Sequence, residues 1–374
     1  MASNQFGRIF RITTWGESHG KAVGVVIDGC PAGLPITEEE VSLELSYRSP
    51  GRNSFVSPRK EPDRAEIYSG VFEGHTTGAP ISIVIPNLDQ DSAKYEPIKD
   101  LLRPGHANYT YKEKYGVFDH RGGGRASGRE TACRVAAGAI AKKLIMSFGI
   151  ELAAYISQIG NISIGDLGDE EVDSLREKAL ESPLFCPDEE ATREMLLALE
   201  QVKAEGDSLG GVVELRGEGL PVGLGDPVYE RIDANLAKAL MSVPACKGVE
   251  IGSGFASAEM KGSFHNDLFE KSIEGKVITK TNHGGGIQAG ISNGMPLVMR
   301  AAFKPSSSIQ KSQETLNEKK EKKTLTLPEG SRHDPCVAIR AVPVVEAMGA
   351  LVIADTLLMN RSAQVCGGHN TVYQ

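Results

Sequence analysis

The sequence predicts an α+β fold in which a single unit, residues 1–374, contains two related halves of about 1–190 and 191–374. Two observations support this prediction. Apolar segments typical of strands alternate with segments of helical period, and the turn Gly29–Leu34 recurs as Gly219–Leu224. Each copy of the turn follows an apolar strand segment and precedes a helical one. A duplicated half explains both the repeat and its context.

The N-terminal segment predicts two strands and one capped helix. Gly7–Thr13 and Ala22–Asp28 have the apolar pattern of strands. Thr37 is followed by three glutamates, which is favourable for an N-cap and a first helical turn, so a helix is expected over Glu38–Tyr47. The polar, Pro- and Arg-rich stretch Tyr47–Arg64 is expected to be a loop.

The next part of the chain predicts two strands, a long connection and a helix. The strands are expected near Ala65–Phe72 and Pro80–Ile85, and the helix over Glu130–Phe148. Between them, Arg103–Arg129 is rich in glycine, histidine and arginine. Long irregular connections in compact domains are usually functional or disordered. Because this one leads into a well-formed helix, we expect it to be functional.

The remaining segments complete the expected order of elements. The acidic block Asn161–Asp207 is expected to be a solvated face, and Pro296–Phe303 a strand. Gln310–Glu329, rich in lysine and glutamate, is expected to be a mobile surface loop. A final helix is expected over Val337–Leu358, with Pro343 kinking it or delaying its start.

The composition excludes membrane, secreted and fibrous classes. With 40% hydrophobic and 24% charged residues the chain lies in the range of ordinary globular proteins. No apolar run reaches the roughly 18 to 20 residues of a membrane helix, and no signal-peptide pattern is present. The six cysteines are scattered without a C-x-x-C pair, which predicts free thiols, no bound metal and a cytoplasmic location.

Two motifs suggest functions that their context excludes. Gly-Glu-Ser-His-Gly at 16–20 matches the nucleophile elbow of serine hydrolases, but that elbow follows several strands and here only one precedes it. The glycines at 284 and 286 with Ala289 match a dinucleotide-binding fingerprint. That fingerprint requires a helix to begin there, and glycine, asparagine and proline follow instead.

The remaining motifs indicate an anion-binding site with proton-transfer groups. The net charge is −8, yet seven Lys or Arg against three Asp or Glu lie between residues 103 and 134, and the arginines are interspersed with glycines. Arginine binds phosphate and carboxylate in bidentate fashion, and glycine lets backbone N–H groups approach an anion. His19, His106 and Asp334 are candidate acid–base groups. Either histidine could instead be structural, and Asp334 could be an N-cap.

At these residues the sequence resembles the chorismate synthases. Six motifs follow the order and spacing of that family, and the resemblance extends from about residue 6 to 358: G-E-S-H-G at 16–20, R-P-G-H-A at 103–107, H-R-G-G-G-R-A-S at 120–127, R-E-T-A at 129–132, K-P-S-S-S at 304–308 and R-H-D-P-C at 332–336. The resemblance implies a β-α-β sandwich, in which a helical layer lies between two antiparallel sheets with an internal pseudo-two-fold repeat. It also implies a homotetramer.

The resemblance implies a lyase activity. Chorismate synthases convert 5-enolpyruvylshikimate 3-phosphate to chorismate by anti 1,4-elimination of phosphate, in the shikimate pathway of aromatic amino acid biosynthesis, and they require reduced FMN. Some relatives also use NADPH as an indirect reductant. Because this chain is near the compact end of the family's length, we expect an external flavin reductase instead. Neither a nucleic acid nor a membrane is an expected partner.

Two other classes of function were weighed against the enzyme. The first is a non-catalytic flavin- or anion-binding protein, which would require that the acid–base residues do not converge. The second is a nucleic-acid-binding module built on the Arg/Gly loop. Such modules interleave aromatic residues with basic ones, and residues 121–129 contain none.

The resemblance also implies residue roles. His19 corresponds to the acid that protonates the departing phosphate, and His106 to the residue that protonates or stabilises the reduced flavin. Asp334 corresponds to part of the relay that removes the ring proton. Ser18 and Ser127 would orient these groups through hydrogen bonds.

Two further sets of residues are implied as ligand contacts. The substrate set consists of Arg48, Arg52, Arg129, Arg134 and Arg332. The FMN set consists of Arg125, Ala126, Ser127, Pro244, Ala245, Ala289, Lys304, Pro305, Ser306, Ser307, Ser308 and Arg332. Relatives often have arginine where this chain has Ser54 and Tyr47, with Arg52 taking the place of the first, so the number of substrate-binding arginines stays open.

Overall fold

Two five-stranded antiparallel sheets form the frame of the molecule. The computed structural model describes residues 3–49, 63–88, 93–165, 167–328 and 334–364. The first sheet has the order β1 (Gln5–Phe6), β2 (Arg11–Gly16), β3 (Ala22–Asp28), β7 (Ile81–Pro86), β4 (Glu66–Ser69). The second has the order β9 (Ile162–Ser163), β8 (Glu151–Ile159), β10 (Gly211–Glu218), β16 (Leu297–Phe303), β11 (Cys246–Ile251).

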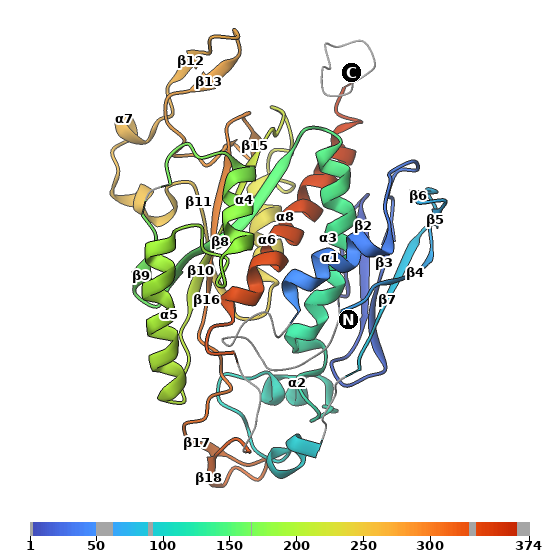
Figure 1. Cartoon of the computed structure of the whole chain (residues 1–374), viewed down its shortest axis with the longest axis vertical. Coiled ribbons are helices and arrows are strands. Elements are labelled where there is room, and N and C mark those ends of the chain that lie inside the picture. Colours follow the sequence, from blue (N-terminus) through green and yellow to red (C-terminus); the bar gives the residue numbers. More distant parts are fainter. Residues whose placement is uncertain (1–2, 50–62, 89–92, 166, 329–333, 365–374) are drawn as a thin grey trace.

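A layer of helices lies between the two sheets (Figure 1). At its centre α8 (Ala338–Asn360) packs against α3 (Thr131–Met146), α6 (Ile232–Met241) and the strands β8 and β10. On the other side α3 packs against β3 and β7. The helices α1 (Glu38–Arg48) and α4 (Val172–Glu181) complete the layer. The apolar core of the molecule is therefore the space between the sheets.

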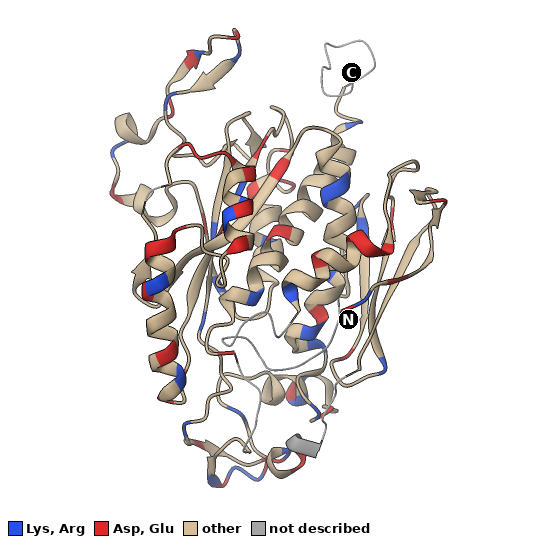
Figure 2. Ribbon diagram, in the orientation of Figure 1, with Lys and Arg blue, Asp and Glu red and all other residues tan. Residues whose placement is uncertain are grey.

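Helix α8 is long and apolar enough to cross a membrane by length and composition, but 89% of its most apolar window is buried inside the fold. It has few charged residues (Figure 2). One of them, Glu346, accepts hydrogen bonds from Lys142 Nζ (2.5 Å), Arg176 Nε (3.2 Å) and the backbone N–H of Ala154 (3.1 Å). Burial opposes ionisation of this carboxyl, but the two cations outweigh it and lower its pKa. This helix therefore has the environment of a globular core.

The two sheets repeat one order of elements. Along the chain β2, β3, α1, β4, β7 and α3 correspond to β8, β10, α6, β11, β16 and α8, and the strand order agrees: β2-β3-β7-β4 and β8-β10-β16-β11. The repeated turns also agree in conformation. Gly29 has φ 77° and Gly219 has φ 73°. A Cβ atom would lie 1.9 Å from the Ile9 carbonyl oxygen at the first position and 2.0 Å from the Gly149 carbonyl oxygen at the second.

Several sequence-based boundaries are confirmed. Strand β3 spans Ala22–Asp28 as predicted, and Thr37 caps α1 in a capping box with Glu40. The first strand, expected over Gly7–Thr13, instead lies at Arg11–Gly16. The reason is that the backbone N–H groups of residues 8 to 10 donate to the carboxylate of Asp355 on α8, which bends this segment away from the sheet.

Other expectations are wrong. The connection 103–129 contains a helix, α2 (Asn108–Tyr115), ended by Gly116 at φ 73°. The expected loop 310–329 forms the hairpin of β17 (Gln313–Leu316) and β18 (Lys322–Leu325). For the acidic block, by contrast, the expected solvated face is confirmed: it forms α4 and α5 (Glu189–Ala204), whose acidic side chains are exposed while the opposite face of each helix is buried. Pro343 lies inside α8, which begins five residues earlier, so it does not delay the start.

Short elements account for the rest of the described secondary structure. These are β5 (Val71–Phe72), β6 (His75–Thr76), β12 (Phe269–Lys271), β13 (Val277–Thr279), β14 (Ile287–Gln288), β15 (Ile291–Ser292), α7 (Gly262–His265), and the 3-10 turns η1 (Ala93–Ile98), η2 (Gly124–Ala126), η3 (Gly128–Glu130) and η4 (Gly254–Glu259).

Candidate active site

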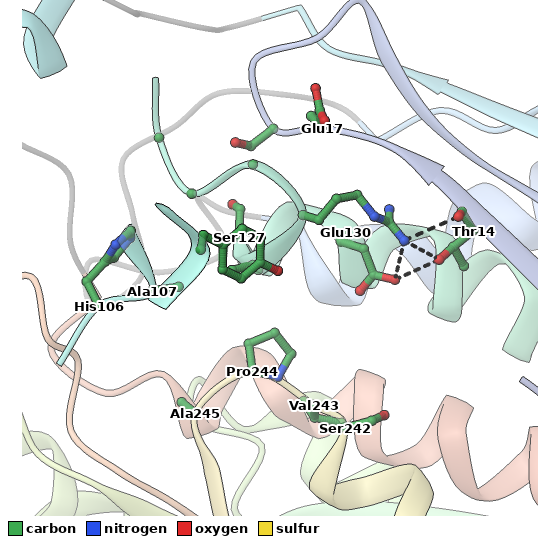
Figure 3. Close-up of a pocket in the computed structure, with 18 of the residues that line it drawn as sticks. Thr14, Glu17, His106, Ala107, Ser127, Glu130, Ser242, Val243, Pro244 and Ala245 are labelled. Atoms are coloured by element: carbon green, nitrogen blue, oxygen red, sulfur yellow. Dashed lines mark hydrogen bonds and ion pairs between the residues drawn. The ribbon is translucent and has the colours of Figure 1, made fainter. Parts of the chain in front are cut away.

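A cavity of about 1470 Å³ lies between the first sheet and the turn from α6 to β11 of the second (Figure 3). Four segments that are far apart in the sequence line it: the turn after β2, the connection 103–128, residues 241–246, and residues 304–308. Six Lys or Arg and three Asp or Glu face it, so it carries excess positive charge in an acidic protein. The cations are Arg103, Lys114, Arg125, Arg134, Lys238 and Lys304.

Most of the predicted site residues line this cavity, and some do not. Those that line it are Ser18, His19, His106, Arg125, Ala126, Ser127, Arg134, Pro244, Ala245, Lys304, Ser306, Ser307 and Ser308. Those outside the lining are Arg48, Arg129, Ala289, Pro305 and Asp334. Arg52 and Arg332 lie outside the described residues. Two loop histidines predicted as acid–base groups therefore converge on one space.

The turn between β2 and β3 presents Ser18 and His19 to the cavity. The His19 ring packs edge-on against Tyr95, with ring centroids 5.3 Å apart and planes at 89°. Ser18 is only 3% exposed, and its Oγ has no hydrogen-bond partner among the described residues. Gly122, at φ 70°, packs against both side chains: a Cβ there would lie 2.6 Å from His19 Cδ2 and 2.9 Å from Ser18 Oγ.

Asn87 braces this turn. Its Nδ2 donates to the carbonyl oxygens of Glu17 (2.9 Å) and Gly20 (2.8 Å), and its Oδ1 accepts from Arg129 Nε (2.7 Å). Asn87 is buried directly after β7. Sequence reasoning missed this residue because an asparagine at the end of a strand is an ordinary turn residue, and its partners are 67 and 70 positions away.

Arg48 and Arg129 lie outside the cavity lining, and the expectation that both contact substrate stays a prediction. Both guanidinium groups are buried and form ion pairs with Asp63, at 2.7 Å for Arg48. Arg48 also donates to the carbonyl oxygen of Gly128 (3.1 Å). Burial raises the pKa of Asp63, but the two arginines outweigh burial and hold it well below its ordinary value. The pair thus supports the cavity wall from behind.

Glu130 forms part of the cavity wall and lies next to Thr14 (Figure 3). Its carboxylate accepts from Thr14 Oγ1 (3.0 Å) and Arg134 Nε (3.0 Å) and lies 3.8 Å from Arg125 Nη2. Arg125 in turn donates to the Thr14 hydroxyl (2.7 Å) and the Gly16 carbonyl oxygen (3.1 Å). The sequence analysis did not single out Glu130 as a site residue. Its position in the R-E-T-A motif, close to several arginines in the sequence, is the signal that could have identified it.

His106 is held neutral in this structure. Burial, with the positive charges of Arg103 and Lys304, lowers the pKa of His106 to about 3. Arg103 Nη2 donates to His106 Nε2 (2.8 Å) and to the Gly122 carbonyl oxygen (2.9 Å), and its guanidinium lies 5.7 Å from the Tyr95 ring centroid. Within the described part of the chain Arg103 has no carboxylate partner. It is therefore a cavity cation available for an anionic ligand.

Asp334 lies behind the cavity, where its carboxylate pairs with Arg340 Nη1 at 3.2 Å. The alternative interpretation of Asp334 as an N-cap is wrong, because the N-cap of α8 is Val337 and no side chain bonds there. Ala289 occupies the turn between β14 and β15 at φ 52°, outside the cavity lining.

These features define an enzyme-type site for a ligand with several negative charges. Cations, aromatic rings and two histidines face one cavity, and no group of three potential metal ligands occurs among the described residues. The model of the family described as "Chorismate synthase" matches residues 10–358. The chain belongs to the chorismate synthase family, and it is a lyase that eliminates phosphate.

Individual relatives agree with this assignment over nearly the full length. The chorismate synthase of Protochlamydia amoebophila is 56% identical, over 98% of this chain and 100% of that protein. The chorismate synthase of Methanococcoides burtonii is 51% identical, over 96% of both chains. A solved structure titled "Crystal Structure of Chorismate Synthase" superposes with a TM-score of 0.74 at 36% identity, covering 94% of this chain and 92% of that one.

Proposed function

We propose that 5-enolpyruvylshikimate 3-phosphate and reduced FMN bind together in the cavity and that phosphate elimination takes place there. The observation that carries this proposal is the convergence of His19 and His106 with six cations on one space. Typical small-molecule sites measure about 300–1,000 Å³, so a cavity of about 1470 Å³ has room for two ligands. The substrate has two carboxylates and a phosphate, which suits the excess of cations.

The residues present fit FMN. The flavin ring system has an apolar dimethylbenzene end and a polar pyrimidine end. Aromatic side chains suit the faces of such a ring, and six of them line the cavity: Phe6, Trp15, Tyr95, Tyr111, Tyr115 and Phe118. The flavin phosphate and ribityl hydroxyls suit Lys304, Ser306, Ser307, Ser308, Arg125, Ala126, Ser127 and the Pro244–Ala245 turn. The buried, unsatisfied Ser18 Oγ calls for a polar ligand. When bound, reduced FMN supplies an electron transiently, with no net oxidation over the reaction.

The chain's own residues would provide the acid–base steps. As the C–O bond breaks, the electron pair leaves with the phosphate, and His19 donates a proton to it. Arg134 and Arg103 stabilise the charge that develops on the leaving group. On the opposite face the ring proton passes to the relay that includes Asp334. The C–H electron pair forms a double bond to the neighbouring carbon, and the existing ring double bond shifts to the carbon that loses phosphate, which gives a conjugated diene. Ser18 and Ser127 orient these groups.

Asp334 belongs to this proposal with one condition. Its carboxylate pairs with Arg340, so it must leave that partner before it accepts a proton in the cavity. Arg52 and Arg332 stay in the proposal as substrate or flavin contacts, and they lie outside the described residues. Arg48 and Arg129 are proposed to act as positioning residues through Asp63 and Asn87.

We also propose the remaining features of the family for this chain: a homotetramer, a cytoplasmic location, and reduced flavin from an external reductase, with NADPH as the indirect source of electrons. Exposed apolar side chains support the homotetramer, because large exposed patches mark interaction surfaces. They cluster on the segment 254–277 and are Phe255, Phe264, Leu268, Phe269, Ile273 and Val277.

The duplicated halves are proposed to meet near residue 149 and not near 190. Support for this boundary comes from β8 (Glu151–Ile159), which hydrogen bonds with β10 in the second sheet. It therefore corresponds to β2, the strand that pairs with β3 in the first sheet. The unit remains a single domain over 1–374, because the helices of both halves share one core.

Anaerobic turnover tests the proposed function. Purified protein, 5-enolpyruvylshikimate 3-phosphate and photoreduced FMN should yield chorismate and phosphate in equal amounts. His19→Ala and His106→Ala should lose most of this activity while still binding flavin. His75→Ala is the matched control, because His75 is an exposed histidine on β6 outside the cavity. Flavin binding without any turnover would favour a non-catalytic binding protein, the alternative function.

A further inference from the structure

Both ring nitrogens of His106 face N–H donors. Arg103 Nη2 lies 2.8 Å from Nε2, and the backbone nitrogen of Asn108 lies 3.3 Å from Nδ1. A guanidinium and a backbone N–H only donate. A protonated imidazole carries N–H on both nitrogens and would direct each of them at another N–H. The charged form would therefore oppose two donors, whereas a neutral ring opposes only one, so the surroundings of His106 favour its neutral form.

A neutral imidazole accepts at one nitrogen only. The contact from Arg103 is the shorter of the two, and its donor is charged, which strengthens a hydrogen bond. The lone pair therefore lies on Nε2 and the proton on Nδ1. Arg103 thereby fixes the tautomer as well as the charge of His106.

The charged groups that face His106 are all cations. Arg103 and Lys304 both disfavour its protonation, and no carboxylate faces it from the described residues. Arg103 itself is half-buried and lines the cavity without a carboxylate partner within the described ranges. An anionic ligand in the cavity would be drawn to this guanidinium, and a guanidinium that turns to a phosphate or carboxylate no longer donates to Nε2.

We propose that Arg103 is a positioning residue that holds His106 as a neutral acceptor through Nε2, and that an anionic ligand binding to Arg103 releases this nitrogen to take a proton. This inference rests on the proposed function for the identity of the ligand. It makes His106 an acid only after substrate has entered. As long as Arg103 donates to Nε2, His106 is neutral.

The role of Arg103 in holding His106 neutral is tested by NMR of ¹⁵N-labelled histidine on the protein without ligand. The expected wild-type result is the Nδ1–H tautomer with no protonation of His106 down to pH 5. Arg103→Met should raise the His106 titration by about one pH unit or more, while burial, the largest cause of the lowered pKa, still holds it below the ordinary value. Lys304→Met is the matched control, which removes a facing charge but no hydrogen bond to the ring, and it should shift the titration less.

Three results would contradict the role that we assign to Arg103. They are an Nε2–H tautomer in the wild type, an unchanged titration in Arg103→Met, and an equal shift in both variants. Even if Arg103→Met does not fold, the wild-type tautomer shows whether Nε2 of His106 accepts a hydrogen bond from Arg103. Arg103→Lys adds a further check, because it keeps the charge but cannot reproduce the planar guanidinium donor.

The release of His106 by an anionic ligand is tested on the wild type with 5-enolpyruvylshikimate 3-phosphate. Flavin is left out, so that the ligand is not consumed. The His106 titration should move upward on saturation, and it should not move further in Arg103→Met. Binding of substrate without this shift overturns the release step. Failure of substrate to bind contradicts the proposed function and the release step together, while the tautomer measurement still decides the role of Arg103 independently.

Discussion

Gly138 of α3 lies against Ala347 of α8 so closely that a Cβ atom on Gly138 would come within 2.4 Å of the Ala347 Cβ. The two helices hold corresponding places in the repeated order of elements, and both residues are buried. Small side chains here let the helix axes approach each other. The centre of the helical layer thus depends on a glycine in the middle of a helix.

Gly138→Ala should destabilise the protein. An added methyl overpacks this contact at about 1–3 kcal/mol, which exceeds the gain of up to about 1 kcal/mol from helix propensity. Urea unfolding measures the change. Gly262→Ala in α7 is the control, since a Cβ there meets nothing within 4 Å, and its stability should be unchanged or slightly higher. Equal stability of Gly138→Ala and wild type would contradict the close contact.

Gly122→Ala should reduce turnover strongly, because its methyl would lie 2.8 Å from His19 Nε2 and displace the ring. A misplacement of about 1 Å in an active site lowers rates by roughly a hundredfold. Gly124→Ala is a matched control in the same loop, with a positive φ of 53° and nothing within 4 Å of its Cβ. It should lose far less activity. Steady-state kinetics on both variants, with thermal unfolding, separate displacement of His19 from backbone strain.

Asp63→Asn should destabilise the fold by about 3–5 kcal/mol, because it leaves two buried arginines without their counter-ion. Asp28→Asn is the control: its pair with Arg11 is solvent-exposed, and surface pairs contribute about 0–1 kcal/mol. Unfolding free energies of both variants test the difference. A loss in Asp63→Asn no larger than in Asp28→Asn would show that the buried cluster does not stabilise the protein.

The Asp63 cluster also predicts a pH dependence. The arginines hold the pKa of Asp63 in the folded protein below its unfolded value of about 3.9. The stabilisation is therefore complete above about pH 4 and is lost as the pH falls toward the folded pKa. Asp63→Asn should show a smaller fall in unfolding free energy over this acid range than wild type. Parallel curves for the two proteins would refute the assignment.

Asn87→Ala should lower kcat by roughly tenfold to a hundredfold with little change in the substrate KM, because the Ser18–His19 turn loses its brace while the cavity cations remain. Steady-state kinetics of the variant and the wild type check this. A loss that appears only in stability, with kcat unchanged, would make Asn87 purely structural.

Several elements of the fold could be predicted from the sequence alone, because they depend on interactions between residues close together in the chain. The bounds of β3, the capping box of α1, the helix α3 and the repeated glycine turn depend on residues close together in the chain, where periodicity and capping rules apply. The same holds for the ordered glycine–arginine motifs, which indicated the family and most of the cavity lining. Helix α2 and the β17–β18 hairpin were not predicted, because their sequences are polar and show little periodic pattern of apolar residues.

Tertiary structure alone decided which charged residues line the cavity. Arg48 and Arg129 were both expected to contact substrate, yet they pair with Asp63, 15 and 66 positions away. The charge of His106 depends likewise on Arg103 and Lys304, which reach it from two different segments. Whether an arginine binds a ligand or a buried carboxylate depends on which acid the fold places beside it. The partners in such an ion pair are far apart in the sequence, so neither a motif nor a periodic pattern predicts the pairing.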